Sequence, residues 1–409
     1  KTYMAMAETM HLAGVAEGMG ISFGAPKLDV NKMRAWKNDV LKKLSGGLDM
    51  QAKKYKVDRI QGTGRFEDGK HVSVEHSDGA NSHIKFKRCI IATGSRSIEL
   101  KGVQIESPRV LTSRTALELE DIPKTLLVLG GGYIGLELGQ VYATFGSKVT
   151  VVEMLPGLMP GVDRDLARPL LRRLDEQFEQ ICLETKVVGM KEVKGGIEVA
   201  FEGKQLPKTT KFDKVLVSVG RRPNTRELQL DKAGVALDER GFIKVDAGFR
   251  TSAQRIYAIG DVIGNPMLAH KAMHEGTVLA DILAGKNEVF EPRAIPAVVF
   301  TDPAIAWAGL TEDEAKQKKI DISMHKIPWS ASGRAVSIGR TDGVTKLIVD
   351  KKSQRVLGVG IAGTHAGEMI AEGVLAIEMG ATAYDLAKTI HPHPTLSEML
   401  GEAASRAGE

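Results

Sequence analysis

The sequence has few cysteines, no long apolar run and no strong excess of one charge. Two cysteines, Cys89 and Cys182, are too few for a disulfide framework and indicate a reducing compartment, the cytoplasm or, in a eukaryote, the mitochondrial matrix. The absence of about 18 consecutive apolar residues argues against a membrane span. A net charge of +5, from 56 basic and 51 acidic residues spread along the chain, argues against nucleic acid as a partner.

The chain also lacks an initiator methionine and a signal-peptide pattern. It begins at Lys1, so we expect it to start at an internal point of a longer polypeptide. Its 409 residues predict roughly two to three domains. A content of 43% hydrophobic and 26% charged residues is typical of a globular protein.

Two apolar runs end on glycine in the same way. Residues 89–94 read Cys-Ile-Ile-Ala-Thr-Gly, and residues 215–220 read Val-Leu-Val-Ser-Val-Gly. Each run is typical of a buried strand that delivers its end to a ligand crevice, and we expect one strand over residues 89–96. The glycine-rich opening that such domains need appears once, at residues 130–135. We therefore expect two nucleotides bound face to face, with the first nucleotide-binding domain incomplete at its N-terminal end.

The strongest motif is a glycine turn between an apolar run and a helical pattern. Residues 126–129 form the apolar run, and Gly130, Gly132 and Gly135 follow with the spacing G-x-G-x-x-G. The first glycine permits a tight turn, the second lets the backbone approach a pyrophosphate, and the third lets the helix pack close to the strand. The phosphates would face the helix N-terminus. The motif predicts a dinucleotide site, and its full context disfavours a glycine turn without a ligand.

The acidic residue after the next predicted strand selects the dinucleotide. Glu153 follows the apolar residues 149–152, about 20 residues beyond the glycine turn. A carboxylate there can accept a hydrogen bond from a ribose 2′-hydroxyl, but it would repel a 2′-phosphate. Met154 and Leu155 supply no arginine to offset that repulsion. The sequence therefore predicts NAD rather than NADP.

Three further segments complete a recognisable set of motifs. They are Ala-Thr-Gly at residues 92–94, Tyr-Ala-Ile-Gly-Asp at residues 257–261, and His-Pro-His-Pro-Thr-x-x-Glu at residues 391–398. Together with the glycine turn, these segments resemble the dihydrolipoamide dehydrogenases, a family of flavin-dependent disulfide oxidoreductases. The resemblance covers essentially the whole chain.

The resemblance implies an α/β fold with two Rossmann-like nucleotide-binding domains and an α+β dimerisation domain at the C-terminus. The FAD-binding domain, incomplete at its N-terminal end, would comprise residues 1–122 and a return segment at 251–293. The NAD-binding domain would be complete at residues 123–250. The interface domain would cover residues 294–409.

The resemblance also implies an activity and partners. The chain would be an NAD-dependent dihydrolipoyl dehydrogenase, oxidising dihydrolipoamide through flavin with hydride transfer to NAD. Its partners would be the lipoyl domain of a 2-oxo-acid dehydrogenase complex and a second copy of itself, in a homodimer with a shared active site. In the family the flavin glycine motif and a C-x-x-x-x-C redox pair come just before the position of Lys1, so we expect the isolated 409-residue chain to be inactive. The family uses no metal, and we expect none.

Cofactor contacts follow from the same resemblance. Asp261 would bind the ribityl chain of FAD, and Lys1 would lie beside flavin N5 with Glu137 as its partner. From the sequence alone, Asp261 as a helix cap, Gly64 as a simple turn and Val187 as plain core remain open. Family members commonly have an aliphatic residue at the position of Tyr133. The implied FAD and NAD contacts are Lys1, Gly64, Thr93, Gly94, Asp261, Ala269, Gly130, Gly131, Gly132, Tyr133, Ile134, Gly135, Glu137, Glu153, Val187 and Gly220.

The C-terminal histidine motif predicts an acid–base pair. His393 precedes a proline, which disfavours helical backbone at the histidine, and Glu398 falls early in a predicted helix. A carboxylate on one ring nitrogen orients the imidazole and raises its basicity, and dithiol chemistry needs a base to form the thiolate. The spacing leaves His391 as a competitor. The family resemblance assigns the base to His393 and the orienting role to Glu398.

Two other functions remain open. A flavin-dependent pyridine nucleotide transhydrogenase or diaphorase would share the nucleotide sites but would not need the His393–Glu398 pair. A non-catalytic NAD-binding or dimerisation module would follow from the lack of redox cysteines in these 409 residues.

Overall fold

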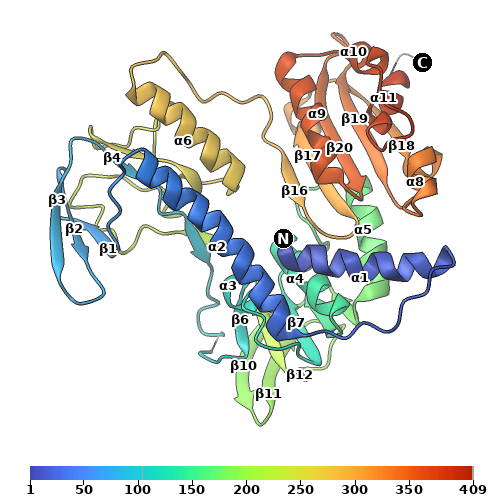
Figure 1. Ribbon diagram of the computed structural model, residues 1–409, viewed down its shortest axis with the longest axis horizontal. Helices are drawn as coiled ribbons and strands as arrows, with labels where there is room; N and C mark the ends of the chain where they lie inside the picture. Colours follow the sequence, from blue (N-terminus) through green and yellow to red (C-terminus); the bar gives the residue numbers. More distant parts are fainter. Residues whose placement is uncertain (104, 408–409) are drawn as a thin grey trace. The chain divides into compact units, whose positions relative to one another are not determined.

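The chain forms two compact units, each built from separate stretches of sequence. The computed structural model describes residues 1–103 and 105–407, so the last two residues of the predicted segment 294–409 lie outside the described part. The first unit comprises Lys1–Asn38, Glu99–Val219 and Pro292–Glu409, and the second comprises Asp39–Ile98 and Gly220–Glu291. Figure 1 shows the elements of both units.

A parallel five-stranded sheet forms the nucleotide-binding part of the first unit. Its order is β6-β13-β7-β8-β9, and every neighbouring pair is parallel. Parallel neighbours need crossover connections, which α4 and α5 supply on either side of β8. The bounds are β6 Val110–Thr112, β7 Thr125–Leu129, β8 Lys148–Val152, β9 Gln180–Cys182, β13 Lys214–Val217, α3 Ser113–Ala116, α4 Tyr133–Thr144 and α5 Arg164–Gln177.

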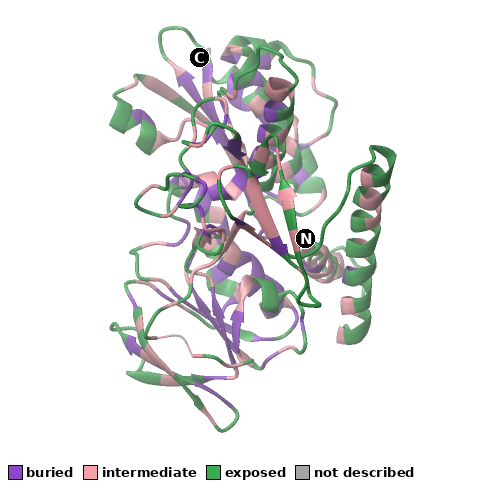
Figure 2. Ribbon diagram, turned by 90° about the vertical axis from the view of Figure 1, so that its left-hand side faces the viewer, coloured by how far each residue is buried: buried purple, intermediate pink, exposed green. Residues whose placement is uncertain are grey.

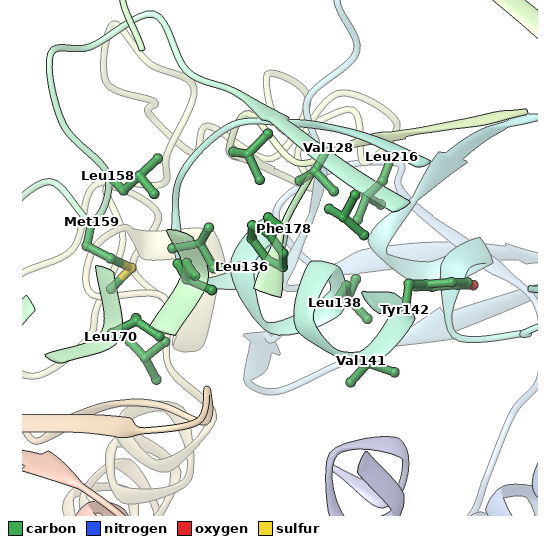
Figure 3. Packing of buried hydrophobic residues seen from close by; sticks show 14 of the residues in the cluster. Val128, Leu136, Leu138, Val141, Tyr142, Leu158, Met159, Leu170, Phe178 and Leu216 are labelled. Atoms are coloured by element: carbon green, nitrogen blue, oxygen red, sulfur yellow. The ribbon is translucent and has the colours of Figure 1, made fainter. Parts of the chain in front are cut away.

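Both faces of this sheet are covered, as the continuous apolar strands require. On one face α4, α5 and the N-terminal helix α1 (Thr2–Gly18) enclose the largest core cluster. Figure 3 shows side chains of that cluster, among them Val128 of β7, Leu216 of β13 and Leu136 of α4. On the other face lies an antiparallel sheet of β10 Lys186–Val193, β11 Gly196–Glu202 and β12 Thr209–Phe212.

The C-terminal part of the first unit is an antiparallel sheet with helices on it. The strand order is β16-β17-β20-β19-β18. Residues 346–361 contain an antiparallel hairpin, in which β19 and β20 pair across a short turn. The bounds are β16 Ala297–Val299, β17 Ala304–Gly309, β18 Ile322–Pro328, β19 Val344–Asp350, β20 Val356–Gly363, α7 Glu312–Lys318, η2 Trp329–Ala331, α8 Gly333–Ser337, α9 Ala366–Met379, α10 Ala383–Lys388 and α11 Glu398–Ser405.

The second unit contains short sheets and the helix α6, which follows the strand end at Gly260 and Asp261. β1, β2 and β3 form an antiparallel sheet, β4 pairs in parallel with β15, and β5 pairs with β14. The helix α2, Val30–Lys54, runs from the first unit into the second and is largely exposed (Figure 2). The bounds are β1 Thr63–Phe66, β2 His71–Glu75, β3 Asn81–Lys85, β4 Cys89–Ile91, β5 Ser95–Ser97, β14 Arg221–Pro223, β15 Ile256–Ala258, η1 Gly260–Ile263 and α6 Ala269–Leu283.

The two glycine-ended runs form shorter strands than their sequence patterns predict. β4 ends at Ile91 and a new strand, β5, begins at Ser95, because Gly94 between them has φ +70° and turns the chain. β13 likewise ends at Val217, before Gly220 with φ +126°. The expectation of one continuous strand from 89 to 96 is therefore wrong.

Within residues 1–103 and 105–407, no helix combines the length and apolarity that a membrane crossing requires.

A buried lysine joins the C-terminal sheet of the first unit to the start of α5 and to α7. The Lys346 ammonium on β19 donates to Asp163 Oδ2 at 2.7 Å, to Asp165 Oδ1 at 3.0 Å and to Glu312 Oε1. The Lys346 side chain is 1% exposed. Burial works against the charge on Lys346, but the hydrogen bonds that its ammonium donates to the three carboxylates outweigh burial and raise the pKa of Lys346. The three carboxylates lie close enough to hold a cation, and the lysine ammonium occupies that position.

We predict that Lys346→Met lowers the free energy of unfolding by about 3–5 kcal/mol, because it leaves buried carboxylates without their cation. Urea unfolding followed by circular dichroism measures this loss. The control is Lys351→Met, which removes an exposed lysine paired with Asp321 and should change stability by less than about 1 kcal/mol. Equal effects of the two substitutions would contradict the role given to Lys346.

Asp165 makes this cluster sensitive to acid. Burial opposes its ionisation, but the hydrogen bonds from Lys326 and Lys346 prevail and hold the pKa of Asp165 below its ordinary value of 3.8. A carboxyl with a lowered folded-state pKa stabilises the fold above its unfolded value, and that contribution disappears as the pH falls through the folded-state pKa. We predict that the stability difference between wild type and Asp165→Asn is constant near neutral pH and shrinks below pH 3.8 in urea titrations. A difference that grows on acidification would refute this.

Candidate functional site

The glycine turn after β7 has the geometry of a dinucleotide cradle. Gly130 has φ +101°, and Gly132 is the extended N-cap of α4. A Cβ on Gly135 would lie 2.4 Å from the Gly130 carbonyl oxygen and 2.6 Å from Ser218 Oγ, so only glycine fits there. At Gly132 a Cβ would meet no described atom within 4 Å. The turn is therefore tight where the helix meets the strand and open where a pyrophosphate would approach.

Glu153 points back to this turn. It follows β8, and its Oε2 accepts a hydrogen bond from the Gly131 N–H at 2.6 Å. Its Oε1 accepts from the Leu155 N–H at 2.8 Å. The structure thus brings the predicted acidic residue to the predicted glycine turn, where a ribose hydroxyl could exchange with these backbone donors.

The other residues predicted for the NAD site have different environments. Tyr133 begins α4 and is partly exposed, whereas the Ile134 side chain packs against the main core. Val187 lies on β10 beside a register shift. It packs at the edge of the core cluster between the parallel sheet and the β10-β11-β12 sheet. Gly220 belongs to the second unit, where its carbonyl accepts the Ile98 N–H at 3.0 Å.

Lys1 and Glu137 form the predicted pair. The Lys1 ammonium lies 3.3 and 3.2 Å from the two carboxylate oxygens of Glu137. Glu137 is buried, and it also accepts the Phe300 N–H at 2.8 Å. The Lys1 Nζ stands 3.5 Å from the centroid of the Phe300 ring, within the range of a cation–π interaction. No sequence pattern marks Phe300, since the contact joins positions almost 300 residues apart.

A cavity lies beside this pair within the first unit. It has a volume of about 600 Å³ and is lined by residues of α1, α4 and α5, by the segment around Phe300, and by the start of α9. The Lys1–Glu137 pair therefore borders a space large enough for part of a ligand.

Asp261 is held by its neighbours in the second unit. Its Oδ2 accepts a hydrogen bond from Ser95 Oγ and lies 3.8 Å from Arg221 Nε. Arg221 Nε also donates to Ser95 Oγ at 2.7 Å. Leu268, and not Asp261, is the N-cap of the following helix α6, which begins at Ala269. The capping alternative for Asp261 is therefore wrong, and its carboxylate remains available for a hydroxyl ligand.

The turn at Thr93 and Gly94 is fixed by a residue that the sequence analysis missed. Asn224 donates from its side chain to the Thr93 carbonyl at 2.8 Å and from its backbone to the Gly94 carbonyl at 3.0 Å. Thr93 Oγ1 donates to the Asn224 carbonyl at 2.9 Å. Gly64 lies inside β1 opposite Val74, so it is not a simple turn.

A second missed residue is Glu275 on α6. It is 1% exposed, contacts the Lys271 ammonium, and accepts the Gly260 N–H at 2.6 Å. Because Gly260 directly precedes Asp261, this buried carboxylate fixes the backbone that carries Asp261. The i,i+4 spacing of Lys271 and Glu275 on the predicted helix is the signal that could have revealed the ion pair.

The C-terminal histidine motif forms the predicted imidazole–carboxylate pair. His393 Nδ1 lies 2.9 Å from Glu398 Oε1, and Glu398 Oε2 accepts the Thr395 N–H at 2.6 Å. The backbone hydrogen bond from Thr395 and then the hydrogen bond with His393 hold the pKa of Glu398 below its ordinary range. The His393 side chain is 79% exposed. The carboxylate thus stays charged while the ring remains open to a reactant.

His391 has the opposite environment. Its Nε2 lies 2.7 Å from Glu372 Oε1, and its side chain is 10% exposed. A Cβ on Gly401 would stand 3.0 Å from His391 Nδ1, so the other face of the ring packs on α11. Both ring nitrogens are therefore enclosed, which makes His391 poorly placed to take a proton from a reactant.

Neither cysteine is a reactive thiol. Burial raises the pKa of the Cys89 thiol to about 11 and also raises that of Cys182. A thiol attacks as its thiolate, so these two groups are inert near neutral pH.

Comparison with known proteins identifies relatives along nearly the whole chain. The model of the pyridine nucleotide-disulphide oxidoreductases matches residues 2–276, and that of their dimerisation domain matches residues 295–404. A dihydrolipoyl dehydrogenase of Vibrio cholerae is 45% identical over 405 residues, covering 99% of this chain and 85% of the relative. Another, of Thermus scotoductus, is 46% identical over 408 residues, covering 99% and 87%.

Solved structures share the fold. The HOCl-induced flavoprotein disulfide reductase RclA of Escherichia coli superposes with a TM-score of 0.87 at 29% identity, covering 99% of this chain and 88% of that one. LpdA of Mycobacterium tuberculosis superposes with a TM-score of 0.91 at 26% identity and the same coverage.

We predict that Glu153→Arg raises the ratio of NADP to NAD affinity at least about tenfold, because it replaces a charge that repels a 2′-phosphate with one that attracts it. Calorimetric titration with each dinucleotide measures the ratio. Glu179→Arg makes the same charge change at an exposed carboxylate paired with Lys148 and should leave the ratio unchanged. An unaltered ratio in Glu153→Arg would remove Glu153 as the selective residue.

Proposed function

Because this chain belongs to the pyridine nucleotide-disulphide oxidoreductase family, we propose that it is a dihydrolipoyl dehydrogenase. It oxidises dihydrolipoamide through flavin and passes a hydride to NAD. The observation that carries this proposal is the 2.9 Å contact between His393 and Glu398, since dithiol oxidation needs a base that a diaphorase or a transhydrogenase does not need.

The family assignment confirms several predictions from the sequence. The fold is α/β with nucleotide-binding domains and a dimerisation domain, and the protein is an oxidoreductase of the flavin- and NAD-dependent class. The division into segments 1–122, 123–250, 251–293 and 294–409 stays a proposal.

The residues of both nucleotide sites fit the cofactors. The turn of Gly130, Gly132 and Gly135 would hold the NAD pyrophosphate, with Glu153 at the ribose. Asp261, fixed by Ser95 and Arg221, would hold the ribityl hydroxyls of FAD near the start of α6. When bound, FAD would supply the acceptor for the electrons of the dithiol, and NAD would supply the acceptor for the hydride.

Near the flavin, Lys1 and Glu137 would act together. The carboxylate of Glu137 fixes the position of the Lys1 ammonium, which also contacts the Phe300 ring. A positive charge at that position would favour negative charge on a reduced ring.

His393 would serve as the base. One thiol of dihydrolipoamide gives its proton to the imidazole, which becomes an imidazolium. Glu398, bonded to Nδ1, orients the ring and stabilises this positive charge. His391 is the weaker candidate, because its Nε2 is already bonded to Glu372 and its ring is nearly buried.

The partners follow from the dimerisation domain. Its match over residues 295–404 supports a homodimer. We propose that the His393–Glu398 pair serves the active site of the second subunit. We also propose that the lipoyl domain of a 2-oxo-acid dehydrogenase complex delivers the substrate. An apolar surface for contact with the second subunit is supplied by exposed side chains, those of Leu375, Met379, Tyr384 and Ile390. The buried thiols fit a reducing compartment, the cytoplasm or a mitochondrial matrix.

We predict that His393→Gln slows reduction of the flavin by dihydrolipoamide at least about 100-fold in the full-length holoenzyme, because the thiol loses its base. Anaerobic stopped-flow absorbance of the flavin measures this rate. Oxidation of NADH by a quinone acceptor should be unchanged, because that reaction needs no thiolate.

The control is His325→Gln, at a histidine on β18 that is bonded to Ser323. It should leave both rates unchanged. An undiminished rate of flavin reduction in His393→Gln would exclude His393 as the base. No turnover of dihydrolipoamide by the wild type would overturn the proposed function itself.

A further inference from the structure

We propose that His391 and Glu372 form a positioning pair that sets the place of the His393 imidazole. The inference rests on the proposed dithiol oxidation and adds two residues to it. Neither residue touches the reacting atoms. They would act by fixing the short segment between α10 and α11 on which His393 lies.

The pair is built as an anchor. Glu372 lies in the middle of α9, nineteen residues before His391, and its carboxylate meets His391 Nε2 at 2.7 Å. The His391 ring is enclosed between Glu372 on one side and the backbone at Gly401 of α11 on the other. A side chain at position 401 would press on this ring, so the glycine makes room for it. The ring thus links two helices through one segment.

The link from His391 to His393 is short and stiff. Only Pro392 separates the two histidines, and its ring fixes one of the two soft backbone angles. The Pro392 carbonyl accepts the Thr395 hydroxyl at 2.8 Å, and the Thr395 N–H donates to Glu398. A shift of His391 therefore reaches both His393 and the carboxylate that orients it.

The electrostatics point the same way. The Thr395 N–H and then His393 lower the pKa of Glu398, and His391 contributes least. The main effect of the pair is therefore on position. Misplacing a catalytic group by a fraction of an ångström is enough to slow a reaction severalfold or more.

The first test compares two substitutions of Glu372 in the full-length holoenzyme. Glu372→Ala removes the anchor and should lower the rate of flavin reduction by dihydrolipoamide about tenfold, because the imidazole is no longer held in line. Glu372→Gln keeps an acceptor for His391 Nε2 and should restore most of the rate. Oxidation of NADH by a quinone should be unchanged in both.

The second test is a double-mutant cycle. If Glu372 acts through His393, then adding Glu372→Ala to His393→Gln should change the remaining rate by less than about twofold. Effects that multiply in the double variant would overturn the proposal, because they would show that Glu372 acts independently of the base.

The matched control is Glu378→Ala on the same helix. Glu378 accepts hydrogen bonds from the backbone N–H groups of Arg293 and Ala294. The substitution therefore removes comparable hydrogen bonds away from the histidines. It should leave flavin reduction by dihydrolipoamide unchanged. A wild-type rate in Glu372→Ala, or an equal loss of quinone reduction in that variant, would refute the positioning role while leaving the proposed function intact. A wild type that does not oxidise dihydrolipoamide would instead refute the function.

Discussion

The interaction on which the first unit depends is the ammonium of Lys346 among three carboxylates. A charge this deeply buried is tolerated only where its partners are in place, so the cluster fixes α5 and α7 against β19 in one arrangement. Close packing accompanies it. A Cβ on Gly360 of β20 would lie 2.2 Å from Leu166 Cδ1 of α5, so the helix sits directly on the strand. The parallel sheet that carries the glycine turn is thereby joined to the C-terminal sheet, on which the helix α11 of the histidine pair packs.

Glutamate carboxylates organise each candidate site in a common way. Glu153 accepts the N–H of Gly131, Glu137 that of Phe300, and Glu398 that of Thr395, at 2.6–2.8 Å. Glu275 does the same for Gly260 in the second unit. In each case a carboxylate fixes a loop beside the residue that would meet a cofactor or a substrate. A charged acceptor makes these hydrogen bonds stronger than neutral ones, which suits loops that must keep their shape without helical or sheet pairing.

The local part of this arrangement could be predicted from the sequence, and the long-range part could not. The strand, glycine turn and helix around Gly130 lie within one short segment, so their spacing predicts their geometry. His393 and Glu398 are likewise near neighbours in the chain. Phe300, Asn224 and Glu372 reach their partners only after folding, and no periodicity marks them. The continuous strand expected at residues 89–96 was wrong because φ at Gly94 is decided by the turn that Asn224 fixes.

The state of the two cysteines has a consequence for an enzyme of thiol substrates. With a pKa of about 11, Cys89 is a thiolate in roughly one molecule in ten thousand at neutral pH, and Cys182 is fully enclosed. Exchange proceeds by attack of a thiolate on a disulfide, so these two protonated sulfurs do not attack the disulfide product to form mixed disulfides with it. The two cysteines therefore stay reduced while the disulfide product forms and leaves, and turnover does not modify the interior of the protein.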